Sequence, residues 1–132
     1  MKSSDQVLLC HAMRLAASVD GRINDEELAL VHGALAALPD FEDLDVDGLQ
    51  AHSDALVKKH GGLLESASAL TGLKSVALRR KAYLLAVEVA YAATGLLPIE
   101  RTLLTLLRKL LRLDARTVKQ IDTVVAWKFA SR

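Results

Sequence analysis

Residues 17–27 read ASVDGRINDEE, and residues 92–100 repeat the pattern as AATGLLPIE. In each stretch an apolar helical run ends at a glycine, an apolar residue follows two positions later, and the next helix begins with a glutamate in its first turn. Glycine can adopt the left-handed conformation that ends a helix, and asparagine or proline suits the start of the next. The two copies therefore predict two helix–loop–helix units in one chain.

The similarity continues into the flanking helices. Alanines and aliphatic residues before the first loop match those before the second at a constant offset, and the match resumes after the loops when one residue is deleted from the second copy. The repeated units span about residues 8–38 and 82–111. This pattern predicts an internal duplication of two helical hairpins that pack face to face.

The composition favours helices over sheets. Apolar residues make up 52% of the 132 residues but aromatic residues only 4%, so the core must be built from leucine, alanine and valine. A chain of this length predicts one domain, residues 1–132, with an all-α fold of about seven helices. The expected helices cover residues 5–18, 24–38, 45–59, 63–70, 76–93, 98–113 and 115 to near the C-terminus.

Other features indicate a cytoplasmic protein. The single Cys10 cannot form an intramolecular disulfide, which is typical of a reducing compartment. Neither a cleavable signal peptide nor an uncharged stretch of about 20 residues is visible.

Charge is distributed unevenly along the chain. Residues 1–66 carry a net charge of −7 and residues 67–132 a net charge of +8. With few aromatic residues and an overall charge near zero, nucleic acid is not an expected partner. The sequence also contains no nucleophile motif and no glycine-rich phosphate loop, which argues against common enzyme classes.

The duplicated loops and their spacing resemble the TerB family of tellurite-resistance proteins, a module that also occurs in some J-domain co-chaperones. The resemblance covers nearly the whole chain. It implies a TerB-like bundle of about seven helices with two pseudo-symmetric hairpins. It also implies that acidic residues from the two loops gather on one side of the bundle, where the family is proposed to bind metal ions.

By position, the resemblance transfers this metal site to Asp20, Glu27 and Glu100, with Glu26 as a neighbour. The fourth expected carboxylate is replaced by Thr94. Oxygen donors of this kind suit Ca²⁺ or Mg²⁺ better than Zn²⁺.

Each of these acids also has a purely structural interpretation. Asp20 precedes glycine in a common turn dipeptide, and Glu27 stands where a capping box needs it. Glu100 lies in the first turn of a helix, where the helix dipole favours a negative charge. The sequence leaves both interpretations open.

Two further acidic features need an explanation. Residues 43–48 read DLDVDG and Asp54 follows, which has the spacing of a calcium-binding EF-hand loop; the alternative is an acidic linker in which Asp45 caps a helix. Glu88 interrupts an otherwise apolar helix, and we expect a cation such as Arg14, Arg79 or Lys81 to pair with it.

The resemblance implies a non-enzymatic cytoplasmic module in the tellurite or stress response, sensitive to divalent cations. It would act as an adaptor for protein partners, including membrane-associated ones, with a peripheral place at the inner membrane. The alternatives are a small metal- or carboxylate-dependent enzyme and a plain interaction domain without metal. The sequence does not define the oligomeric state.

Overall fold

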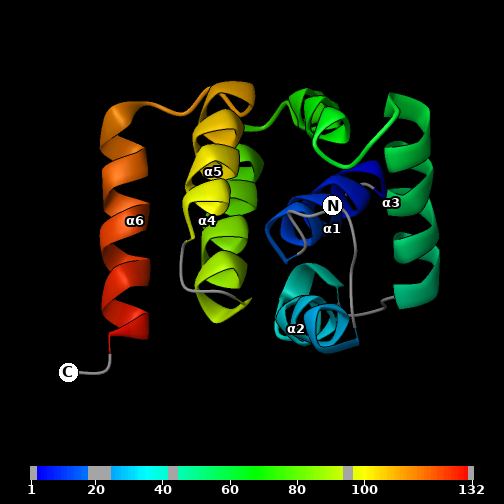
Figure 1. Cartoon of the computed structure of the whole chain (residues 1–132), viewed down its shortest axis with the longest axis horizontal. Helices are drawn as coiled ribbons and strands as arrows, with labels where there is room; N and C mark the ends of the chain where they lie inside the picture. The colour runs from blue at the N-terminus through cyan, green and yellow to red at the C-terminus, as the bar shows by residue number, and fades with distance from the viewer. Residues whose placement is uncertain (1–2, 18–24, 42–44, 94–96, 131–132) are drawn as a thin grey trace.

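The computed structural model describes residues 3–17, 25–41, 45–93 and 97–130, and the regular structure in these ranges is entirely helical, with no strand (Figure 1). This confirms the all-α expectation. The elements are α1 (Ser3–Ala17), α2 (Asp25–Ala36), the 3₁₀ helix η1 (Pro39–Phe41), α3 (Val46–His60), the 3₁₀ helix η2 (Glu65–Gly72), α4 (Val76–Ala93), α5 (Pro98–Leu110) and α6 (Ala115–Phe129). None of these helices is both long and apolar enough to cross a membrane.

Local sequence signals set most of the helix ends. The Asp45 carboxylate accepts a hydrogen bond from the Gly48 amide at 3.0 Å and caps α3, and Asp114 caps α6 in the same way through Thr117 at 2.7 Å. Gly61 ends α3 with φ of 82°, in the left-handed region that glycine adopts without strain. The ends predicted at these positions are therefore confirmed.

Two predicted ends differ from the structure. The short helix expected at residues 63–70 is η2, which is a 3₁₀ helix and lies two residues further along. The helix expected to reach Leu113 ends at Leu110, because the chain turns at Arg112, whose φ is 54°.

The centre of the bundle is α4, as its nearly uninterrupted apolar sequence predicted. It packs against α1, α2, α5 and α6, and its contact with α1 is the most extensive in the molecule. Fully buried alanines are spaced four residues apart along α4, at positions 82, 86 and 90, and α1 contributes buried alanines at 12 and 16. Such small side chains allow two helix backbones to approach closely.

The structure does not test the proposed duplication. In both predicted units the first helix contacts the second, α1 with α2 and α4 with α5. The loops that carry the repeated motif, at residues 18–24 and 94–96, lie outside the described residues. The superposition of the two hairpins stays a prediction.

A buried polar network connects α1, α3 and η2. His11 is inaccessible to solvent, and its Nδ1 and Nε2 lie 2.7 Å and 2.8 Å from the hydroxyl oxygens of Ser53 and Ser66. The Ser66 hydroxyl donates its proton to the Leu63 carbonyl, so it must accept from Nε2–H. Nδ1 then accepts from Ser53, whose oxygen also accepts from Arg14. This arrangement requires a neutral imidazole.

We predict that His11 makes the protein sensitive to acid. Burial, followed by the charge of Arg14, lowers the pKa of His11 from 6.5 to about 4. The unfolded chain binds the proton below pH 6.5 and the folded protein does not, so stability is full above pH 6.5 and falls as the pH drops toward 4. The loss from this group is about 3 kcal/mol.

Denaturant unfolding at several pH values measures this effect. A His11→Gln variant is expected to be less stable at pH 7 but to lose about 3 kcal/mol less than the parent between pH 7 and pH 4. Parallel pH profiles for the two proteins would show that His11 is not the responsible group.

Candidate metal centre

Glu100 is the most unusual acidic residue in the described structure. It lies in the first turn of α5, which begins at Pro98, a residue whose fixed φ and missing amide proton suit this position. Its side chain points inward with Leu103, Leu104 and Leu107 rather than toward solvent, and only 1% of its surface is exposed.

The Glu100 carboxylate lacks a full set of partners. Among the residues that the structure describes, no donor lies within hydrogen-bond distance of its Oε2 atom, although that atom is buried. Burial raises the pKa of Glu100, and the charge of Glu27 raises it further. A buried carboxylate without a donor is costly unless a proton or a cation compensates it.

Glu27 comes to this region from a different helix. It lies in the first turn of α2, partly exposed, beside Asp25 and Glu26, which are exposed. The structure thus brings two of the three expected site residues, Glu27 and Glu100, close enough for their charges to interact. Both belong to N-terminal turns, where the helix dipole favours negative charge.

The other expected residues lie outside the described ranges. Asp20 and Thr94 belong to residues 18–24 and 94–96, so the structure does not place them. Within the ranges that are described, no group of three His, Cys, Asp or Glu side chains could hold a metal ion. A complete site at this position would therefore need a ligand from outside these ranges.

The lone cysteine does not extend the site. Cys10 is buried in α1, and burial raises its thiol pKa to about 11, so the thiol is protonated at neutral pH. A protonated, buried thiol is a poor metal ligand and a poor nucleophile.

The EF-hand interpretation of residues 43–54 is wrong. Asp45 uses its carboxylate to cap α3, and α3 then continues without interruption to His60. Asp54, which would be the last calcium ligand, lies in the middle of this helix and pairs with Arg14 of α1. The acidic linker with a helix cap is the correct alternative.

The sequence did not suggest the partner that the structure gives Glu88. Glu88 pairs with Lys128 of α6 at 3.0 Å, a cation outside the expected set of Arg14, Arg79 and Lys81. The carboxylate is 31% exposed, so α4 is less completely buried at this position than its sequence suggested.

One sequence signal could have shown that Glu100 is buried. It precedes Leu103, Leu104, Leu107 and Leu111 at the spacing of one helix face, and all four leucines are buried. A glutamate in the first turn is expected to be buried when it continues the apolar face of its helix and exposed when it lies on the opposite face. The helix dipole favours its charge in both cases.

We predict that Glu100→Gln stabilises the protein when chelator removes divalent ions. The substitution removes a buried charge that the charge of Glu27 repels. We expect a gain on the order of 1 kcal/mol in the free energy of unfolding at pH 7.

The gain has a defined pH dependence. Because the pKa of Glu100 is raised in the folded state, the parent loses stability as the pH rises through the titration of this carboxyl, and the variant does not. The free energies of unfolding of the parent and of Glu100→Gln should therefore become equal at acidic pH. Glu65→Gln, at an exposed acid of η2, is the control. A destabilised Glu100→Gln protein at pH 7 would contradict this account.

Comparison with known proteins identifies the family. The family model described as tellurite resistance protein TerB matches residues 6–123, which is most of the chain. No curated protein and no solved structure gave a significant match. The matched range includes both acidic helix starts, α2 and α5. The chain belongs to the TerB family.

Proposed function

We propose that this protein is a non-enzymatic TerB module of a tellurite- or stress-response system, and that a divalent cation regulates it at the N-termini of α2 and α5. Membership of the TerB family supports the general role, because this domain is generally a non-catalytic module. One observation supports the cation in particular. The Glu100 carboxylate is 1% exposed, has a buried oxygen without a donor among the described residues, and lies near the charge of Glu27.

A hard divalent cation would compensate both carboxylates at once. Glu27 and Glu100 supply oxygen donors, and Asp20 would add a third from the loop between α1 and α2. An all-oxygen donor set favours Ca²⁺ or Mg²⁺, and no sulfur or imidazole in the described part of the site favours Zn²⁺. The site would thereby join the two halves of the molecule.

The proposed cellular role is that of an adaptor. Cation binding would fix the start of α2 relative to the start of α5, and so change a surface that protein partners contact. We place these partners at or near the inner membrane, with this protein in the cytoplasm. An enzymatic alternative would need a substrate cavity at Glu100, and the grooves between α5 and α6 and between α2 and α4 are lined by other side chains.

We predict that titration calorimetry detects binding of Ca²⁺, Mg²⁺ or Mn²⁺ to the chelator-treated protein. Asp20→Ala and Glu100→Gln should each weaken this binding at least about tenfold, because affinity depends on the number of charged ligands. Glu65→Gln should leave it unchanged. The same ions should raise the melting temperature of the parent but not that of Glu100→Gln.

Thr94→Asp provides a test in the opposite direction. If both loops contribute to the site, the added carboxylate should raise the affinity for the cation, because a hydroxyl supplies no charge against the cost of dehydrating the ion. If calorimetry detects no heat of binding with any ion, for either the parent or Thr94→Asp, the protein is an interaction domain that binds no metal.

A further inference from the structure

The last two helices form the walls of a groove. Both α5 and α6 pack against α4, and α6 lies at one end of the molecule (Figure 1). Two cavities, of about 380 and 460 Å³, open between them, and both are lined by Arg108 of α5 and Asp122 of α6. The two cavities are therefore neighbouring parts of one groove.

An ion pair between Arg108 and Asp122 connects α5 and α6 across the middle of the groove. Arg108 Nη2 lies 3.0 Å from Asp122 Oδ2, and its Nε donates to the hydroxyl of Tyr83 at 2.9 Å. The Tyr83 hydroxyl donates in turn to Asp122 Oδ1 at 2.7 Å. Tyr83 is fully buried in α4, so the bridge is anchored to the central helix.

The cations that line the groove outnumber its acids. Arg101, Arg108 and Lys119 line the two cavities, and Asp122, which pairs with Arg108, is the one acid among the lining residues. Arg101 and Lys119, both exposed, add one cation to each wall.

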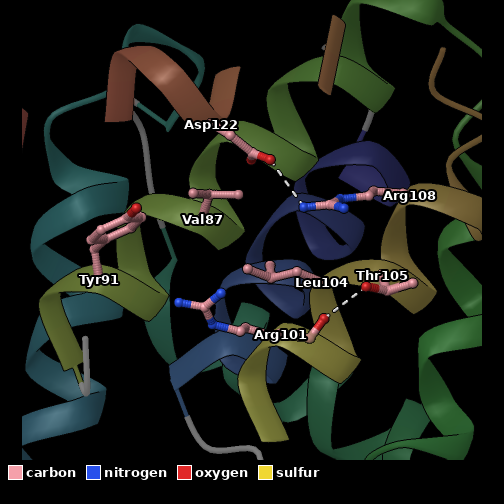
Figure 2. A pocket seen from close by; sticks show the side chains of 7 residues that line it. All are labelled: Val87, Tyr91, Arg101, Leu104, Thr105, Arg108 and Asp122. Atoms are coloured by element: carbon pink, nitrogen blue, oxygen red, sulfur yellow. Dashed lines mark hydrogen bonds and ion pairs between the residues drawn. The ribbon is translucent and has the colours of Figure 1, made fainter. Parts of the chain in front are cut away.

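Apolar side chains lie between these cations. Figure 2 shows Leu104 between the guanidinium groups of Arg101 and Arg108. Val87 and Tyr91 of α4 line the same cavity. The second cavity is lined by Leu113 and Val118 on the other side of the bridge. A ligand for this groove thus needs apolar groups for its interior and negative charges for its walls.

We infer that the groove binds an acidic amphipathic helix of a partner protein, with leucine-like side chains in the two cavities and carboxylates on Arg101, Arg108 and Lys119. The lining residues run from Arg101 to Arg108 in α5 and from Ala115 to Thr123 in α6, so the groove follows about two turns of each helix. Helix-in-groove recognition uses apolar side chains at this spacing, and charge complementarity sets its specificity. This surface is separate from the proposed cation site and does not depend on it.

The test uses a fluorescein-labelled peptide of about 15 residues. Leucine recurs in it every three or four positions, and glutamate fills most others. A second peptide replaces every glutamate with glutamine. Anisotropy is measured on the full chain at low and high salt, with and without chelator. We expect binding of the acidic peptide, at least about tenfold weaker binding of the neutral one, and weakening by salt.

Two variants examine the groove independently. Arg101→Gln combined with Lys119→Gln removes one cation from each wall and should lower the affinity at least about tenfold. Thr105→Trp changes no charge but fills the first cavity from an exposed position, and should abolish binding. Lys58→Gln combined with Lys59→Gln removes two exposed charges from α3, at the other end of the molecule, and should have no effect. Circular dichroism verifies that each variant is folded.

Several results would overturn the inference. Absence of peptide binding, or binding that neither groove variant weakens, would exclude this ligand. The peptide could fail to bind while the parent binds phosphatidylglycerol vesicles and the groove variants do not. In that case the groove binds anionic lipid instead of a peptide. If sedimentation shows that the parent self-associates and the groove variants do not, the occupant is a second copy. Chelator should change none of these results, so failure here is distinct from failure of the cation site.

Discussion

The contact between α1 and α4 is the constraint on which the rest of the structure depends. Every other α-helix packs against one of these two: α2 and α5 contact both, α3 contacts α1, and α6 contacts α4. Both helices carry fully buried alanines, at 12 and 16 in α1 and at 82, 86 and 90 in α4, and such small side chains allow two backbones to lie close together. His11 of α1 is a buried polar residue, and each of its two ring nitrogens has a partner.

Glu100 has a buried oxygen without a partner among the described residues, and the fold explains why this is costly. The apolar face of α5 must pack against the α1–α4 centre, and Glu100 occupies the first position of that face. Burial of the four leucines of this face therefore also buries the Glu100 carboxylate, within reach of the charge of Glu27. A protein retains such an arrangement at a cost in stability, and compensation by the proposed cation would give that cost a function. The same geometry leaves the other edge of α5 free to form a cationic groove with α6.

Much of the fold could be predicted from the sequence, because its signals are local. Asp45, Gly61 and Asp114 act on neighbouring backbone groups, and the structure places a helix end at each. Tertiary partners could not be predicted in this way. Glu88 meets Lys128, forty residues away, and Arg14 meets Asp54, because these pairs depend on how the helices are arranged. For the candidate site, the sequence predicted the acids at the helix starts but not the burial of Glu100, which depends on packing.

The central claim is that Glu100 is a buried, uncompensated carboxylate that a divalent cation satisfies. A carbon-detected NMR titration of the Glu100 carboxyl, assigned by comparison with Glu100→Gln, tests it most directly. Without divalent ions the account predicts that the pKa of Glu100 lies above the ordinary value for glutamate, and that saturating Ca²⁺ or Mg²⁺ lowers it. An ordinary pKa that neither ion changes would contradict the account.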